Sequence, residues 1–312
     1  MLSRNNIRIK VLQALYANEV NPMEDSAAAE KFFVRSVNDT YRLYLLIMYY
    51  LQKVSSYSLK DFEIRSRKFV PTEDDSKASL IMYENPVVKA LRDSNSFHAV
   101  LKKQGIVQLL DEDLVRRLFK LFAESEYYEF YRNAKNMPLK EHQYALVKLY
   151  MILREDEGFV EHLSDNFPSW DDDESLVYGA IKRSLRDLPH NVSFFIEQLP
   201  NSEFVNDLGK DLLYKVMRYN EEVQAMIAAK LKNWNEDRVA QLDMIMMKMA
   251  ICEFIYFESI PTKVTINEYV NVAKLYSTDK SKRFINGILD RLMQDLHEEG
   301  KINKTGRGLI DE

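Results

Sequence analysis

The chain of 312 residues contains few of the residues that interrupt helices. Only 8 Gly and 8 Pro are present, and long stretches are rich in Leu, Met, Lys and Glu. Strong helix formers with few breaks between them predict helices rather than short strands. The length can hold two ordinary domains, or one helical domain enlarged by an insertion. We therefore expect an all-α fold.

Cysteine and long apolar runs are equally scarce. The single cysteine, Cys252, excludes an internal disulfide and fits a reducing compartment. No run of about 18 uncharged apolar residues occurs, which argues against a membrane span. The first ten residues carry Arg4, Arg8 and Lys10, and no uninterrupted apolar core follows, so we expect no signal peptide. The sequence thus predicts a cytoplasmic protein without membrane contact.

The motifs of common enzyme classes are also missing. The sequence contains no G-x-x-x-x-G-K-[ST], no G-x-G-x-x-G after a strand pattern and no G-x-S-x-G. Cys252 lies in an apolar stretch, where a thiol is normally inert. The five histidines form no short-spaced pair and have no cysteine cluster beside them, so we expect no metal site and no cofactor. Nothing in the sequence favours an enzyme.

Negative charge slightly exceeds positive charge overall, but positive charge is in excess at the two ends of the chain. The formal net charge is −5, yet residues 260–310 hold nine Lys/Arg against six Asp/Glu. The first twenty residues hold Arg4, Arg8 and Lys10 against Glu19. A polyanion would therefore be bound by the ends of the chain rather than by its middle.

Helical periodicity is clearest near the two termini. A helix is predicted over Arg4–Val20, with Arg4 and Arg8 one turn apart on its polar side. Taken alone, this side is most simply a solvated face. Near the other end, Thr265 and Glu268 have the spacing of a capping box, which predicts a helix start at Thr265. A second helix, apolar along one stripe, is predicted after the polar run 277–282.

The middle of the chain is predicted to hold one long helix and several short ones. The long helix spans about 27–56, and its dense tyrosines are typical of an amphipathic core. Residues 61–79 are polar and predict a loop. Short helices with apolar stripes are expected between residues 80 and 234.

Four segments resemble the NusB family of bacterial transcription antitermination factors. Residues 260–274 read IPTKVTINEYVNVAK and residues 283–290 read RFINGILD, close to the family's C-terminal signature. Residues 13–16 match its Q-A-L-Y motif, and residues 242–254 run parallel to its central helix. So long an ordered series is far more specific than one short motif.

The resemblance implies a NusB-like helical bundle of two subdomains. The predicted N-terminal subdomain covers 1–232 and contains a family-atypical insertion over about 60–230. The predicted C-terminal subdomain covers 233–299, and residues 300–312 are expected to form a flexible tail.

The resemblance also implies a function. NusB proteins bind the boxA element of nascent ribosomal RNA together with NusE, which is also a small-subunit ribosomal protein, and modify the transcribing RNA polymerase complex. The implied RNA contacts lie at the start of the first helix and in the loop before the last: Arg4, Asn5, Asn6, Arg8, Lys10, Lys280, Ser281, Lys282 and Arg283. Arg and Lys would hold phosphates, and Asn and Ser would contact base edges.

Three charged residues in the apolar segment 242–254 need partners, because a buried charge is costly when unpaired. Asp243, Lys248 and Glu253 either form intramolecular ion pairs or help to contact the basic partner protein. Two alternative functions differ from RNA binding. One is a protein-only scaffold that uses the acidic middle of the chain. The other, the NusB-like domain of some RNA methyltransferases, has little support because no catalytic domain follows Ile310.

Overall fold

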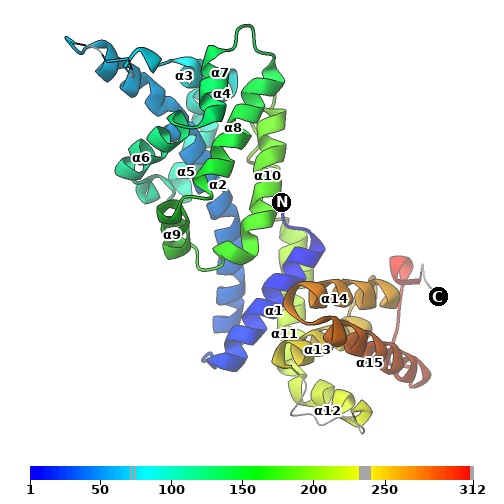
Figure 1. Cartoon of the computed structure of the whole chain (residues 1–312). Coiled ribbons are helices and arrows are strands. Elements are labelled where there is room, and N and C mark those ends of the chain that lie inside the picture. The colour runs from blue at the N-terminus through cyan, green and yellow to red at the C-terminus, as the bar shows by residue number, and fades with distance from the viewer. Residues whose placement is uncertain (71, 74, 232–239, 310–312) are drawn as a thin grey trace. The chain divides into compact units, whose positions relative to one another are not determined.

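The computed structural model describes residues 1–70, 72–73, 75–231 and 240–309. Every regular element within these ranges is a helix, which confirms the all-α prediction (Figure 1). The helices fall into two compact units. We call residue 1 together with residues 38–199 the middle unit, and residues 2–37 together with 200–312 the terminal unit.

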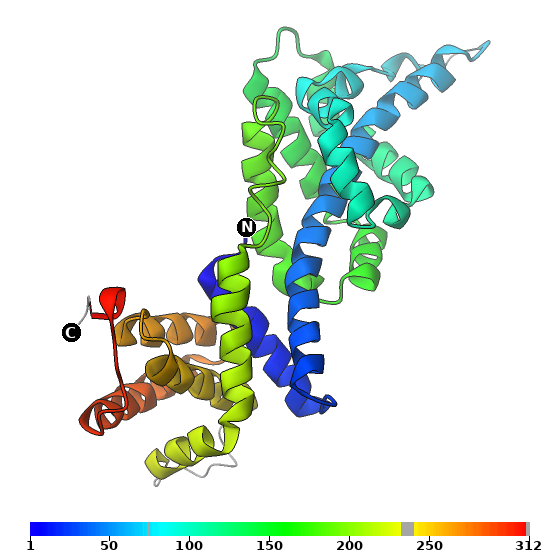
Figure 2. The same cartoon turned by 180° about the vertical axis from the view of Figure 1, so that it is seen from behind.

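The middle unit is built around the later part of α2 (Ser26–Ser66), and shorter helices pack along it (Figures 1 and 2). In chain order these are η1 (Asp75–Lys77), α3 (Ile81–Glu84), α4 (Pro86–Asp93), α5 (Asn95–Lys103), η2 (Val107–Leu109), α6 (Glu112–Ala123), α7 (Glu126–Asn133), α8 (Leu139–Leu153), α9 (Glu157–Asn166) and α10 (Trp170–Asp187). Residues 43–51 of α2 are apolar nearly all round, and every one of them is buried. A helix of this kind is stable only when other helices enclose it.

The tyrosines of α2 belong to the core of the middle unit, as their helical spacing predicted. The hydroxyl of Tyr44 lies 2.6 Å from Oγ of Ser184, and the hydroxyl of Tyr50 lies 3.0 Å from Nε2 of His162. The helix is longer than predicted and continues through Ser66. Its last turns are polar, and the Arg65–Asp61 pair, at 2.9 Å, supports them on the helix surface.

The terminal unit combines both ends of the chain. Its elements are α1 (Arg4–Val20), the start of α2, the π-helix η3 (Phe204–Lys210), α11 (Asp211–Arg218), α12 (Asn220–Lys230), α13 (Gln241–Tyr256), α14 (Thr262–Tyr276), α15 (Asp279–Glu298) and η5 (Gly306–Leu309). The helix α1 has the predicted bounds. The central helix α13 contacts α1, α11, α12, α14 and α15, because its side chains are apolar on every side.

The predicted capping box at Thr265 is wrong. The helix α14 begins at Thr262, with Pro261 as its N-cap residue. Thr265 is buried inside the helix, where its hydroxyl donates to Oε2 of Glu253 at 3.3 Å and to the carbonyl of Pro261 at 3.4 Å. Thr265 and Glu268 therefore do not cap α14; they contact Glu253 of α13 and Arg8 of α1 instead.

The grouping of helices also differs from the predicted subdomains. The predicted boundary at 232–233 lies outside the described residues. Within the described chain, α1, α11 and α12 pack against α13 and so belong with the C-terminal helices. The predicted flexible tail is wrong for residues 301–309, which pack against the terminal unit: Nζ of Lys304 donates to the carbonyls of Glu253 and Phe257.

Candidate functional site

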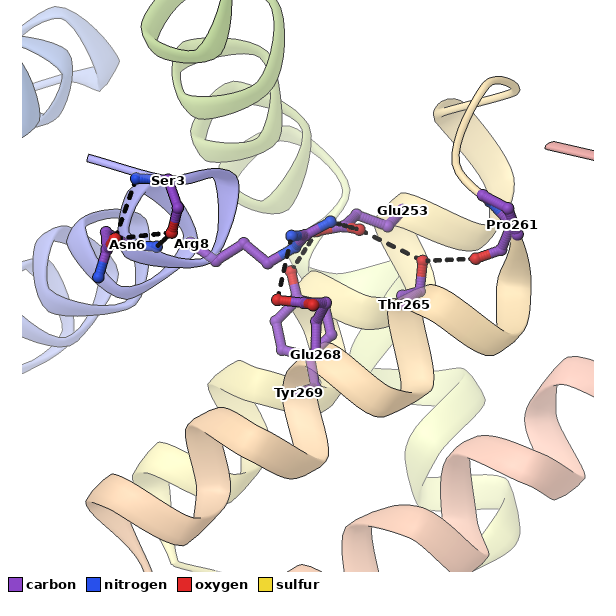
Figure 3. A network of polar contacts seen from close by, with 8 residues as sticks. All are labelled: Ser3, Asn6, Arg8, Glu253, Pro261, Thr265, Glu268 and Tyr269. Carbon is purple, nitrogen blue, oxygen red and sulfur yellow. Dashed lines mark hydrogen bonds and ion pairs between the residues drawn. The ribbon is translucent and has the colours of Figure 1, made fainter. Parts of the chain in front are cut away.

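The start of α1 is fixed by a capping box. The hydroxyl of Ser3 accepts from the backbone N–H of Asn6 at 3.3 Å, and Oδ1 of Asn6 accepts from the backbone N–H of Ser3 at 2.9 Å (Figure 3). These bonds satisfy two N–H groups that have no partner inside the helix. The predicted RNA-binding residue Asn6 is thus a capping residue, and it holds the backbone from which Arg4 and Asn5 project.

Arg8 lies in the interior and pairs with Glu253 of α13. Its Nε lies 2.7 Å from Oε1 of Glu253, and its Nη2 lies 2.8 Å from Oε2 (Figure 3). Glu268 lies 3.6 Å from Nη1 of Arg8, and the hydroxyl of Tyr269 donates to Oε1 of Glu253 at 2.7 Å. The network joins α1, α13 and α14 through residues that are far apart in the chain.

The electrostatics of this network favour the ionised pair. Burial alone would lower the pKa of Arg8, but Glu253 reverses this effect and the pKa is raised, so the guanidinium stays charged. Burial and the neighbouring Glu253 raise the pKa of Tyr269 well above its ordinary value. Tyr269 therefore stays protonated and continues to donate to the carboxylate.

Two of the predicted RNA contacts expose almost no side-chain surface. Arg8 is 2% exposed and Lys10 is 1% exposed. Because RNA phosphates must reach a cation from solvent, we remove Arg8 and Lys10 from the predicted RNA surface. Arg4 and Asn5 remain: the side chain of Arg4 is half exposed, whereas Asn5 is partly buried.

Arg4 and Asn5 line an open groove of about 470 Å³ in the terminal unit. Ile260 and Pro261, just before α14, form another part of its wall, and Arg8 and Glu268 reach it from the buried network. Arg307 of η5 also lines this groove. Arg307 was not among the predicted RNA contacts, because its segment was predicted to be a flexible tail.

The other predicted RNA contacts lie at the start of α15. Thr278 caps this helix and accepts from the N–H of Ser281 at 3.2 Å. Lys280 and Arg283 are exposed, whereas Ser281 and Lys282 are partly buried.

The two sets of contacts do not converge on one point. The helix α14 runs beside α1, since Glu268 pairs with Arg8 and the hydroxyl of Tyr276 lies 3.4 Å from Nε2 of Gln13. Arg4 therefore lies near the start of α14, and Lys280 follows its end. A helix of 15 residues is about 22 Å long at 1.5 Å per residue.

The three predicted partner-binding residues are all buried. Asp243 is 3% exposed, Lys248 is 4% exposed and Glu253 is fully buried. Nζ of Lys248 donates to Oδ1 of Asn220 at 2.8 Å and lies 3.6 Å from Oε1 of Glu19. Glu253 and Lys248 thus form the intramolecular ion pairs that were the alternative to partner contact.

Comparison with known proteins identifies the family of this chain, and the family match covers the α14 side of the groove and the start of α15. A sequence model of the NusB family matches residues 175–294, which begin within α10 and end within α15. The transcription antitermination protein NusB of Geobacter sulfurreducens is 36% identical over 104 residues, which cover 33% of this chain and 75% of that protein. The protein belongs to the NusB family.

Two further NusB proteins are similar over a comparable length. The transcription antitermination protein NusB of Salinibacter ruber is 39% identical over 104 residues, or 33% of this chain and 65% of that protein. The one of Chloroherpeton thalassium is 38% identical over 117 residues, or 36% of this chain and 56% of that protein. The chain thus spans less than two thirds of these two NusB proteins. No solved structure matches the chain significantly.

The described part of the chain also bears on two other features, a metal site and a membrane span. Within it, no group of three or more His, Cys, Asp or Glu side chains is arranged to hold a metal ion. None of the described helices is both long and apolar enough to cross a membrane. The groove beside Arg4 and the exposed cations of α15 therefore remain the candidate site of this NusB-family protein.

Proposed function

We propose that this protein is a transcription antitermination factor that binds a boxA-type single-stranded RNA together with NusE and acts on the transcribing RNA polymerase complex. The observation that carries the proposal is the set of exposed cations at the two ends of α14. Arg4 lies at one end, and Lys280 and Arg283 at the other, in a chain whose net charge is −5. Family membership and the names of the relatives support the same function.

The proposed RNA path runs along α14. A strand that contacts Arg4 and Lys280 must cover roughly 20 Å, the length of this helix. Arg and Lys at the ends would hold phosphates and fix the position of the strand, and Asn5 and Ser281 would contact exposed base edges. Arg8 serves this surface indirectly, since its pair with Glu253 holds α1 against α13.

No residue is assigned to the proposed NusE contact. Asp243, Lys248 and Glu253 are buried, so a partner protein cannot reach them in this conformation. The NusE contact is therefore proposed from family membership alone.

The test is RNA binding by a charge-reversal variant. Lys280→Glu with Lys282→Glu should weaken binding of a boxA-type RNA and flatten its salt dependence by about 1.4 in log–log slope, because two phosphate contacts are lost. Lys102→Glu with Lys103→Glu, on the exposed side of α5, changes the net charge equally and should leave binding unchanged. Unchanged affinity and slope in the Lys280 variant would contradict the proposal.

A protein-only scaffold is the second candidate function. It is favoured by the middle unit, most of which precedes the family match at residue 175. Residues 155–174 of this unit contain nine Asp/Glu and no Lys or Arg, so they would suit a basic protein partner. Binding of boxA-type RNA, measured with and without NusE, separates the two functions: no binding in either case favours the scaffold.

A further inference from the structure

The C-terminal segment 301–309 is anchored to the end of α13. Lys304 is 8% exposed, and its Nζ donates to the carbonyl of Glu253 at 3.1 Å and to that of Phe257 at 2.8 Å. These carbonyls belong to the last turn and the C-cap residue of α13, and each also accepts one backbone N–H, from Phe257 and Ile260 respectively. The N–H of Thr305 donates to the carbonyl of Glu258 at 3.0 Å, and Ile302 is buried. The segment therefore occupies a defined position.

Gly308 fixes the position of the residue before it. A Cβ at Gly308 would lie 2.0 Å from the carbonyl oxygen of Glu258, so no other residue fits without displacing the backbone. This close approach brings η5 against the segment that precedes α14. Arg307 consequently lies at the groove that Arg4 also lines.

Arg307 supplies the groove with a positive charge that the described residues do not neutralise. It is exposed, and no carboxylate among the described residues lies within ion-pairing distance of it. Arg8 lines the same groove, but Glu253 and Glu268 balance its charge. Arg4 has one long carboxylate contact, at 3.7 Å with the exposed Glu203, and its Cζ lies 4.9 Å from the ring centroid of Phe204, which is uncharged. Arg4 and Arg307 are thus the two cations of the groove that can accept a new anionic partner.

We propose that segment 301–309 is a wall of the RNA-binding groove and that Arg307 binds a phosphate of the strand that Arg4 also contacts. This inference rests on the proposed RNA-binding function. A guanidinium presents paired N–H donors that match two phosphate oxygens, so it suits a phosphodiester better than an ammonium group does. Lys304 and Gly308 are positioning residues, because they act only through the place they give to Arg307.

The first experiment measures RNA affinity of the full chain by fluorescence anisotropy over a range of salt concentrations. Arg307→Gln should bind a boxA-type RNA about tenfold more weakly than the wild type, as expected for one lost charge-assisted contact. Its log–log salt slope should be smaller by about 0.7. Arg291→Gln, an equal charge change on the exposed side of α15, serves as the matched control and should bind like the wild type.

A second variant keeps the charge but moves it. Gly308→Val should displace η5 and weaken RNA binding as Arg307→Gln does, although Arg307 is still present. Helical circular dichroism and the melting temperature of each variant show whether the rest of the chain is folded. Equal effects of these two changes, in folded proteins, would support the positioning role of Gly308.

The outcomes separate this inference from the proposed function. If Arg4→Gln weakens binding but Arg307→Gln keeps the affinity and salt slope of the wild type, segment 301–309 is not part of the groove, although the RNA function stands. If Arg307→Gln weakens NusE binding and not RNA binding, the assignment to phosphate is overturned. If the wild type binds no RNA with or without NusE, both proposals fall together.

Discussion

The guanidinium of Arg8 and the carboxylate of Glu253 form a buried two-point ion pair between residues 245 positions apart, with Nε–Oε1 and Nη2–Oε2 distances of 2.7 and 2.8 Å. This pair connects the first helix to the central helix of the terminal unit. Tyr269 and Thr265 donate further bonds to the same carboxylate, so its charge is well compensated. The first turn of α1 and the groove beside it depend on this connection.

Breaking one side of the pair should be strongly destabilising. Arg8→Met leaves a buried carboxylate without its cation, and Glu253→Gln leaves a buried guanidinium whose only remaining carboxylate neighbour is Glu268, at 3.6 Å. Each change should lower the free energy of unfolding by about 3–5 kcal/mol in urea denaturation. The double variant should lose clearly less free energy of unfolding than the sum of the two single losses, because neither charge is then left without its partner.

The exposed pair between Arg4, on the same helix, and Glu203, just before η3, provides the control. Arg4 and Glu203 lie 3.7 Å apart and are at least half exposed, so Arg4→Met should change stability by only about 0–1 kcal/mol. Additive losses for Arg8→Met and Glu253→Gln, within about 0.5 kcal/mol, would show that the two side chains do not act as a pair.

Two helical glycines should respond oppositely to alanine. A Cβ at Gly209 would lie 2.3 Å from Cζ of Phe33 and 2.9 Å from Cγ2 of Ile7, and both side chains are buried. Gly209→Ala should therefore destabilise the terminal unit by about 1–3 kcal/mol through overpacking. At Gly287, in α15, no atom beyond the adjacent residues and the backbone of its own helix lies within 4 Å of the added Cβ, so Gly287→Ala should stabilise the helix by about 0.5–1 kcal/mol. Thermal melting of both variants is the measurement, and a shift of the same sign in both would refute the packing argument.

Local periodicity predicted the helices well. The bounds of α1 were predicted correctly, and the apolar surface of residues 242–254 predicted the enclosed central helix α13. These features depend on neighbours within one or two turns, which a sequence displays directly. The end of α2 was missed because its last turns are polar and resemble a loop in composition.

Long-range contacts could not be predicted in the same way. Arg4 and Arg8 occupy the same side of α1 in the sequence pattern, yet only Arg4 is exposed, because the partner of Arg8 lies on α13. Thr265 has capping-box spacing but binds Glu253. Lys304 and Gly308 lie in a polar, glycine-containing stretch typical of disorder, and only the carbonyls of α13 and Glu258 explain their positions. A local pattern indicates which residues are charged but not which of them find partners.

The thiol of the only cysteine should be unreactive in the folded protein. Cys252 is fully buried in α13, and this burial raises the pKa of its thiol to about 12. Since the thiolate is the reactive form, an aromatic disulfide reagent should not modify the native chain at neutral pH over the time in which it modifies the unfolded chain completely. In the variant Lys102→Cys the added thiol is exposed, so the native protein should release one additional equivalent of the reagent's aromatic thiolate at once. Rapid reaction of the native wild type would mean that α13 opens readily.

The stability of the middle unit should depend on the protonation of His142. Its Nδ1 lies 2.6 Å from the hydroxyl of Tyr131, and that hydroxyl accepts from Nδ2 of Asn85 at 3.0 Å, so its own proton points to the imidazole. Burial lowers the pKa of His142 below its ordinary value of 6.5, and the folded state therefore favours the neutral ring. The unfolded chain binds the proton more readily, so stability falls as the pH decreases below about 6.5, and the loss levels off below the folded pKa.

A variant without a titrating ring isolates this effect. His142→Asn keeps an acceptor for Tyr131 but cannot be protonated in this range. Between about pH 7 and pH 5, urea denaturation should show a steeper loss of stability for the wild type than for His142→Asn. Above about pH 7.5, where the ring is neutral in both the folded and the unfolded chain, the difference between the two proteins should be constant. If the two pH profiles run parallel down to pH 5, His142 is not the group that links protonation to the stability of this unit.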